Sequence, residues 1–231
     1  MSPHSGVTEL ETLSAERPVL RADARLNRER ILIAAREAFV EQGADVPLEE
    51  IAARAGVGIA TLYRRFPDRR ALQRAVALDV LGRIAVEARA AIDEEPDGFS
   101  ALIRYMRRAL SLQVSAVVPA LLGAVELEDE SFQAIRTESA SFLQQIIERA
   151  DAEGTLRPGI SFGDIALLLV RLSRPLPGPI ERALDMEMAQ RHLSMLIDGL
   201  RAERATGDLP GAGLTLDMLR SLPGEPVDPQ G

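Results

Sequence analysis

The chain of 231 residues is 46% hydrophobic and 27% charged, with 3% aromatic residues and a net charge of −8. Many Ala, Leu and Arg residues and few β-branched runs favour an all-α fold, and the absence of Cys excludes disulfides and favours a cytoplasmic protein. No apolar run approaches the roughly 20 residues of a membrane span, and the first 20 residues lack the features of a secretory signal, so no membrane partner is expected.

Apolar residues recur at helical spacing in the front part of the chain. Residues 1–20 are predicted to be a loosely held tail. Helices are predicted over 25–42, 48–55 and 59–66, with Gly56-Val57-Gly58 as the turn between the last two. Asp68 is a suitable N-cap for a longer helix over 69–92. A longer helix followed by two short ones around a Gly-containing turn predicts a helix-turn-helix unit over residues 21–68.

The remainder predicts a second helical domain over residues 69–204. Its later helices are expected over 99–113, 116–125, 131–152, 162–172 and 180–204. Loops rich in charged residues, Gly and Pro separate them at 94–98, 155–159 and 175–179. Residues 205–231 are dense in Gly and Pro and are predicted to be a loosely held tail, with one turn of helix at 216–222.

The short segment 59–66 is the first candidate for function. Its scaffold is predicted to consist of small and medium apolar residues, namely Ile51, Ala52, Ala55, Val57, Leu62 and Phe66. The residues left for solvent or a partner are then Ile59, Ala60, Thr61, Tyr63, Arg64 and Arg65. A helix of this length is not stable alone, and one that presents Tyr and Arg suits a DNA major groove about 12 Å wide.

The charge distribution agrees with a polyanion partner at the front end alone. Residues 21–75 hold 11 Arg against 8 Asp or Glu, whereas the remainder holds 16 Arg against 27 acidic residues. A solvated surface of mixed charge is the alternative explanation of this excess.

Residues 25–76 resemble the DNA-binding domain of the tetracycline-repressor (TetR) family of transcriptional regulators. The similarity lies in "RILIAAREAFVEQG" and "LEEIAARAGVGIATLYRRFPDRRALQRAV" and in their spacing. The resemblance implies an all-α, dimeric protein that binds operator DNA until a small ligand in the C-terminal domain releases it.

The resemblance also implies roles for single residues. Thr61 and Tyr63 match positions that contact phosphates or bases, Arg65 matches a backbone contact, and Arg69 matches a phosphate-binding residue. Positions that vary and read bases correspond to Ile59, Ala60 and Arg64, and the phosphate or minor-groove contacts at the first helix correspond to Arg25 and Arg28. For each side chain, packing, solvation or an ion pair is the alternative.

Two residues depart from the family pattern. Gly58 stands where Ser often caps the recognition helix, and Gly is a weaker cap. Pro47 stands where Thr often opens the second helix and contacts phosphate. Because Pro has neither a hydroxyl nor an N–H, one backbone contact is in doubt.

The C-terminal part is similar to the SbtR-like group of this family, through "AEGTLRPGISFGDIALLLVRL" and "LDMEMAQRHLSMLIDGLRA". The resemblance implies that these two helices pair with their copies in a second subunit. The expected interface residues are Leu168, Leu172, Leu184, Met188, His192, Leu193, Leu196 and Leu200. An intramolecular core is the alternative. Two-fold symmetry would place the recognition helices about 34 Å apart on a palindromic operator.

A ligand pocket should be apolar with a few converging polar groups. The candidate lining residues for an unknown small-molecule effector are Phe99, Ile103, Tyr105, Met106, Leu110, Leu122, Phe142, Ile146, Leu169 and Arg171, each of which can instead be plain core. Arg104, Arg107 and Arg108 matter if the ligand is anionic.

Catalysis is not expected, because the chain has two His and no Cys and lacks metal-ligand spacing or a nucleophile–base pair. No metal and no cofactor are predicted, and the acidic cluster Glu126, Glu128, Asp129 and Glu130 suits solvated acids or a weak divalent-ion site. The expected function is a homodimeric repressor. The alternative is a ligand-independent DNA-binding dimer with a packed C-terminal core.

Overall fold

The computed structural model describes residues 7–121, 130–176 and 178–221. In this part of the chain the regular structure is helical, and an isolated antiparallel bridge joins Leu156 to Arg201. The all-α prediction is therefore confirmed. The chain divides into two compact units, residues 1–72 and 73–231, and helix α4 (Arg69–Glu94) runs across the division.

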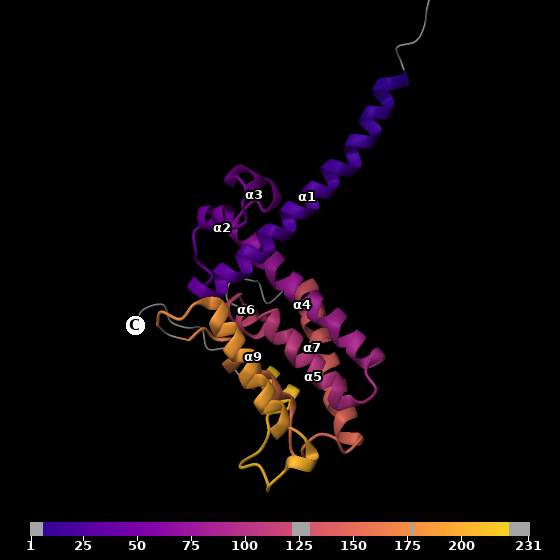
Figure 1. The fold of residues 1–231 in the computed structure, drawn as a ribbon, viewed down its shortest axis with the longest axis vertical. Helices are drawn as coiled ribbons and strands as arrows, with labels where there is room; N and C mark the ends of the chain where they lie inside the picture. Colours follow the sequence, from indigo (N-terminus) through magenta and orange to yellow (C-terminus); the bar gives the residue numbers. More distant parts are fainter. Residues whose placement is uncertain (1–6, 122–129, 177, 222–231) are drawn as a thin grey trace, which may run out of the picture. The chain divides into compact units, whose positions relative to one another are not determined.

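The first unit contains α1 (Val7–Gln42), α2 (Leu48–Arg54) and α3 (Ile59–Arg65), with α2 packed on α1 and α3 on α2 (Figure 1). The apolar faces predicted from sequence meet in its core, where Ile31, Phe39 and Ile51 are fully or almost fully buried.

Helix α1 begins at Val7, well before the predicted start at residue 25. The apolar stripe that set this prediction marks the buried part of the helix, from Ile31 onward. The earlier residues include many Leu, Glu, Ala and Arg, which have high helix propensity without an apolar face. The predicted tail over residues 1–20 is thus helical from Val7, residues 1–6 lie outside the described ranges, and the loose attachment of the segment stays a prediction.

Polar side chains fix α2 against the end of α1. Arg54 donates hydrogen bonds to the carboxylates of Glu41 and Glu50, at 2.6 and 2.9 Å, and Gln42 also donates to Glu50. These hydrogen bonds, from Gln42 first and Arg54 second, lower the pKa of the Glu50 carboxyl. Exposed ion pairs contribute little stability individually, so their role is to set the position of α2.

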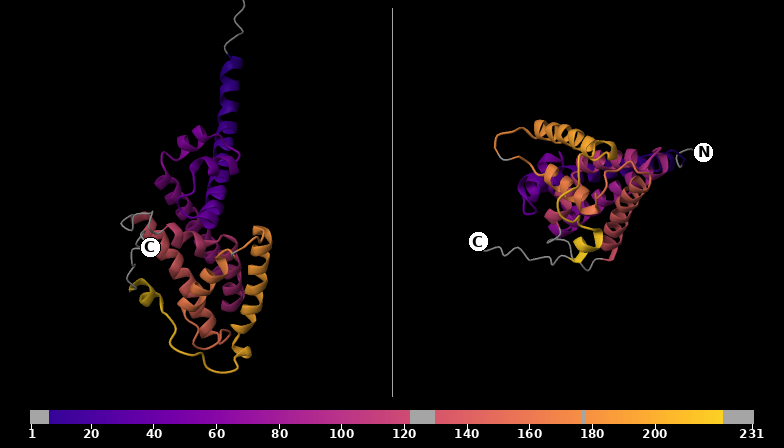
Figure 2. Two further views of the ribbon diagram at one scale, coloured as in Figure 1. Left: turned by 90° about the vertical axis from the view of Figure 1, so that its left-hand side faces the viewer. Right: turned by 90° about the horizontal axis from the view of Figure 1, so that it is seen from below.

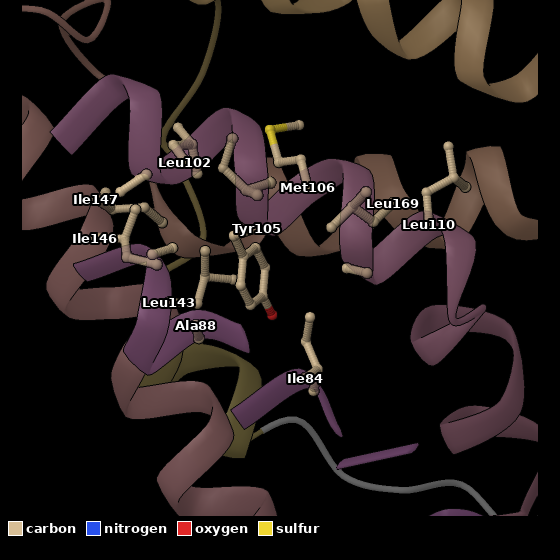
Figure 3. Packing of buried hydrophobic residues seen from close by; sticks show 14 of the residues in the cluster. Ile84, Ala88, Leu102, Tyr105, Met106, Leu110, Leu143, Ile146, Ile147 and Leu169 are labelled. Atoms are coloured by element: carbon tan, nitrogen blue, oxygen red, sulfur yellow. The ribbon is translucent and has the colours of Figure 1, made fainter. Parts of the chain in front are cut away.

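Helix α5 (Gly98–Ser111) is the centre of the second unit. It packs against α6 (Val114–Leu121), α7 (Glu130–Ala152), α8 (Phe162–Ser173) and α9 (Arg182–Gly199). Figure 3 shows the core around it, with Leu102 and Met106 of α5 among residues from α4, α7 and α8. Figure 2 shows α9 at the outer edge of this unit.

The helix ends differ from the predicted bounds at two places. Helix α9 ends at Gly199 rather than 204, because the following residues bond to the loop after α7 and then form the short 3-10 helix η1 (Ala202–Arg204). Arg157 N–H donates to the Leu200 carbonyl at 2.8 Å, and Ala202 N–H donates to the Thr155 carbonyl at 3.1 Å. Helix α6 begins at Val114, and the part of the predicted helix 116–125 from residue 122 onward lies outside the described residues.

The segment after α9 packs on the second unit, so the prediction of a loosely held tail is wrong for residues 205–221. The Gly163 N–H donates to the Leu214 carbonyl at 2.8 Å, and a Cβ on Gly163 would lie 2.6 Å from the Leu214 side chain. Arg157 also donates to the Gly207 carbonyl at 2.7 Å. The predicted turn at 216–222 is the helix α10 (Leu216–Ser221), which packs on α8. Gly and Pro density thus indicated irregular backbone, not absence of contacts.

Candidate nucleic-acid interface and ligand cavity

The turn between α2 and α3 is closed by backbone hydrogen bonds. Gly56 has a φ of +65°, a left-handed conformation that favours glycine. The Val57 N–H donates to the Ala52 carbonyl at 3.0 Å. On the other side of the turn, the Gly58 carbonyl accepts from Thr61 and Leu62 N–H at 2.8 and 3.2 Å. The predicted helix-turn-helix geometry is therefore present.

Helix α3 holds its polar face outward through two apolar side chains. Leu62 is fully buried and Phe66, directly after the helix, is 4% exposed. Tyr63 is 46% exposed, and the predicted contact residues Ala60, Arg64 and Arg65 are also exposed, whereas Ile59 and Thr61 are half-buried. A short helix that presents Tyr and two Arg while its other face is fixed can place these side chains in a major groove.

Three further arginines of the first unit were predicted to contact DNA, and they differ in their surroundings. Arg25 is exposed. Arg28 is also exposed, with its guanidinium 6.0 Å from the centroid of the Phe66 ring. Arg69 is half-buried, and its Nη1 donates to the carbonyls of Ala44, at 3.2 Å, and Val46. Arg69 therefore ties the loop between α1 and α2 to the start of α4, in addition to any contact with phosphate.

The two departures from the family pattern are visible at the helix starts. Pro47 precedes α2, and its carbonyl accepts from the N–H groups of Glu50 and Ile51 at 3.1 and 3.3 Å. Neither Pro47 nor Gly58 provides a side-chain cap. The first N–H groups of α3 therefore receive no hydrogen bond from a side-chain cap.

The second unit contains a cavity of about 580 Å³, partly open to solvent. Its walls come from α4 to α8 and α10, and are mainly apolar: Leu81, Val114, Val118, Ala140, Leu143, Phe162, Ala166, Leu167, Leu169, Val170 and Leu216. The polar lining residues are Tyr105, Ser115, Gln133, Arg136, Thr137 and Ser139. Small side chains at Ser115, Ala140 and Ala166 leave space that larger residues would fill.

Of the residues predicted to bind a ligand, Tyr105 and Leu169 line this cavity. The prediction fails for five others, which are buried in the hydrophobic core and are not part of the cavity lining: Phe99, Met106, Leu110, Phe142 and Ile146. These apolar side chains pack in the hydrophobic core instead, which was the alternative to ligand binding. Arg171 is exposed and lies at a small depression beside α9, and Leu122 is outside the described residues.

Ile103 lines a separate, shallow depression on α5 together with Arg104, Arg107 and Arg108. Arg104 donates to Glu87, Glu94 and Glu95 at 2.6, 2.8 and 3.1 Å. These hydrogen bonds, with that to Glu94 the largest, raise the pKa of the Arg104 guanidinium. Its charge is therefore compensated by acidic neighbours within the chain.

The sequence analysis missed the polar residues that α7 contributes to the cavity. Gln133, Arg136 and Ser139 recur every three residues and Ala140 lies four residues after Arg136, so the four share one face of the helix. A stripe of small and polar residues in place of the apolar stripe of a packed helix is the signal that indicates such a wall.

The predicted dimer residues fall into three groups. Leu193 and Leu200 are 0% and 9% exposed and belong to the core of their own chain, so their assignment to an interface is corrected. Leu184 and Leu196 are 50% and 40% exposed, and His192 is exposed as well. Met188, Leu168 and Leu172 are half-buried. Met195, which the prediction omitted, is 58% exposed on the same side of α9.

Other kinds of site receive no support from the described residues. None of the described helices combines the length and apolarity needed to cross a membrane. Glu126, Glu128 and Asp129 of the predicted acidic cluster lie outside the described ranges, and elsewhere no three His, Asp or Glu side chains gather as metal ligands would.

The family comparisons agree with this geometry. Residues 31–76 match the model of bacterial regulatory proteins of the tetR family, and residues 97–202 match that of the transcriptional regulator SbtR-like C-terminal domain. No curated protein sequence matches the chain.

Solved structures give the same assignment. The TetR transcriptional regulator SCO0520 from Streptomyces coelicolor is 32% identical with a TM-score of 0.54, covering 75% of this chain and 98% of its own. A TetR transcription regulatory protein from Mycobacterium vanbaalenii is 34% identical with a TM-score of 0.52, covering 79% and 99%. The TetR-like regulator LfrR from Mycobacterium smegmatis, solved with proflavine, has the same fold at 23% identity, with a TM-score of 0.55 and coverage of 74% and 95%. The chain therefore belongs to the TetR family of transcriptional regulators, which are DNA-binding proteins and not enzymes.

Proposed function

We propose that this regulator is a homodimeric repressor that binds a palindromic operator and is released when a small molecule enters the C-terminal unit. The DNA-binding part of the proposal rests on α3, which has one buried side and one exposed side. Leu62 is fully buried while Tyr63 is nearly half exposed, so the same short helix is fixed on one side and free on the other. The exposed Arg64 and Arg65 follow directly.

Arginine suits this position because its planar guanidinium can donate two parallel hydrogen bonds to guanine O6 and N7. Phosphate contacts by Arg25, Arg28 and Arg65 would set the register of the protein on the duplex without selecting its sequence. The protein as a whole is acidic, so binding depends on the local excess of Arg in the first unit.

The dimer part rests on the apolar side chains that α9 leaves exposed. Leu184, Met195 and Leu196 lie on one side of the helix, together with the exposed polar side chain of His192. Large apolar side chains grouped on an exposed surface are typical of an interface. A second copy of the same surface provides the two-fold symmetry that a palindromic operator requires.

The ligand-release part rests on the cavity. A volume of about 580 Å³ lies within the range of small-molecule sites. This favours a sensor over the alternative of a ligand-independent dimer with a packed C-terminal core. Leu81 of α4 lines the cavity, and the same helix begins at Arg69, within the first unit. A ligand that prefers one position of α4 would thereby shift the population of DNA-binding dimers.

Selection of bound duplexes from a random DNA pool tests the proposal. We expect enrichment of an inverted repeat whose half-sites lie about one helical turn apart. On the selected DNA, Tyr63→Ala should weaken binding while the dimer stays intact by light scattering, and substitution of the exposed Arg107 on α5 by Ala serves as a control. If the pool yields no repeat, or if Tyr63→Ala binds as tightly as the unsubstituted protein, the assigned reading face is wrong.

A further inference from the structure

We propose that the cavity of the C-terminal unit takes an apolar molecule with one anionic oxygen group, held by Arg136 and Tyr105. This inference rests on the ligand-release part of the proposed function and names the chemical class of the ligand. Three observations carry it: a tyrosine hydroxyl without a described hydrogen-bond partner in the cavity lining, an arginine without an acidic partner, and walls that are otherwise uncharged and mainly apolar.

The Tyr105 hydroxyl is the first observation. The residue is 6% exposed and lines the cavity, yet no described residue forms a hydrogen bond with the hydroxyl. Figure 3 shows the hydroxyl at the end of the ring that points away from Leu102. Burial alone raises the pKa of this phenol, so it remains protonated and is a hydrogen-bond donor. An oxygen acceptor on a molecule bound in the cavity could accept a hydrogen bond from this hydroxyl.

Arg136 is the second observation. It is half-buried in the cavity wall on α7, and no described carboxylate forms an ion pair with it. Ser139 lies three residues later on the same face of the helix and is 5% exposed, which adds a hydroxyl to the same wall of the cavity. Arginine in a partly enclosed site suits carboxylate or phosphate oxygens, since it can donate two parallel hydrogen bonds.

The charge of the lining gives the sign of the ligand. Arg136 carries the sole formal charge among the described residues that line the cavity, and no Asp or Glu is among them. A half-buried positive charge without a counter-ion disfavours binding of a cation and favours binding of an anion. The electrostatic interaction between the guanidinium and a charged ligand is stronger away from water. An acidic ligand would therefore be attracted where a basic one of the same shape would be repelled.

The remaining walls indicate that the rest of the ligand is apolar. Leu143 of α7, Phe162 and Leu169 of α8 and Leu216 of α10 contribute apolar surface from separate helices. Burial of an alkyl or ring system against them contributes affinity in proportion to its area. The ligand class is thus an apolar body with an anionic end.

Calorimetry on the full-length dimer tests the proposal with four probes of equal chain length, namely decanoate, monodecyl phosphate, 1-decanol and decylamine, each below its micelle concentration. We expect decanoate or the phosphate to bind at least 10-fold more tightly than the alcohol and the amine. The stronger of the two anions identifies the head group. Arg136→Gln should reduce anion affinity roughly 10- to 100-fold, as removal of a charge-assisted hydrogen bond implies, and leave the alcohol unchanged.

Two further variants sharpen the test. Tyr105→Phe removes the hydroxyl and keeps the ring, so it should weaken the anion roughly 3- to 10-fold without changing the unfolding temperature. Arg107→Gln makes the same charge change outside the cavity and should have no effect. The proposal is overturned if decylamine binds as tightly as decanoate, if no probe binds, or if Arg136→Gln leaves anion binding unchanged.

Measuring both ligand binding and release of DNA distinguishes a wrong ligand class from a wrong release mechanism. Binding of decanoate that depends on Arg136 but does not release the selected DNA would support the ligand class and contradict the release mechanism. Release of the DNA by neutral or cationic compounds alone would support release and contradict the ligand class.

Discussion

Arg64 donates a hydrogen bond from Nη2 to the hydroxyl of Thr61, one turn earlier on α3, over 2.8 Å. Thr61 is half-buried and Arg64 is exposed, so a partly fixed hydroxyl restrains the guanidinium on the reading face. A restrained Arg loses less side-chain entropy on binding DNA than a free one. The two residues should therefore act on operator affinity as a unit.

A double-mutant cycle on the selected operator tests this unit. Arg64→Ala should weaken binding by about 1–3 kcal/mol, the typical cost of removing a bidentate hydrogen bond to a base. Thr61→Val keeps the shape of the side chain and removes the hydroxyl, and it should cost less. The double variant should differ from the sum of the two by at least about 0.5 kcal/mol, as for residues in contact. Strict additivity, measured by fluorescence anisotropy, would argue that the pair acts independently.

Substitution of Arg25 and of Arg69 should distinguish a residue that only contacts phosphate from one that also stabilises the fold. Arg25→Ala should reduce the slope of log K against log salt by about 0.9 for each phosphate that Arg25 neutralises, with the unfolding free energy unchanged. Arg69→Ala should in addition lower the unfolding free energy by about 1–3 kcal/mol, because its guanidinium holds the carbonyls of Ala44 and Val46. Urea unfolding distinguishes the two, and equal stability of both variants would contradict the role given to Arg69.

Charge placed on the exposed side of α9 should separate the subunits. Leu196→Asp and Leu184→Asp put a carboxylate at side chains that are 40% and 50% exposed in the single chain. We expect sedimentation to show monomers with unchanged helix content, because burying an unpaired charge in an interface is costly. Val86→Asp, at a 72% exposed position on α4, is the matched control. Leu193→Ala should behave differently and cost about 2–5 kcal/mol of stability, since Leu193 is fully buried within its own chain.

The Asp97 carboxylate caps the central helix of the second unit. It accepts from the Ser100 N–H at 2.7 Å, and this hydrogen bond is the main reason that the pKa of Asp97 is lowered. Asp97→Ala should cost about 0.5–2 kcal/mol at neutral pH, and Asp97→Asn should restore most of it. Because the folded pKa is depressed, the stabilisation from ionised Asp97 is present above its ordinary pKa near 3.9 and is lost as the pH falls through the folded pKa. Urea unfolding of both variants at pH 7 and pH 3.5 measures this stabilisation. A destabilisation by Asp97→Ala that grows on acidification would contradict the role of ionised Asp97 as the helix cap.

The helix-turn-helix unit was predictable because its information is local. Ile51, Ala52 and Leu62 occupy apolar positions within a dozen residues, and the turn between them is marked by Gly56 and Gly58. The same periodicity predicts the other helices, although not the start of α1, where Leu, Glu, Ala and Arg form a helix without an apolar face.

The cavity was not predictable in the same way, because an empty volume is a property of several helices together. Phe142 and Ile146 fill the core from α7, whereas Arg136 and Ala140 on the same helix line open space. The dimer surface presents a similar difficulty. Leu193 and Leu196 are equally apolar in the sequence, and only the packing of α9 separates the buried one from the exposed one.

The contact of Leu214 with Gly163 brings Leu216 into the cavity wall, near the end of the described chain. The ribosome therefore completes the helix-turn-helix unit about 150 residues before it adds the last part of the proposed ligand site. A nascent or proteolytically clipped chain that stops soon after α9 would keep its recognition helix and lack one side of its sensor. Such a truncated regulator would be expected to bind its operator and to lose the response to the proposed ligand that releases it.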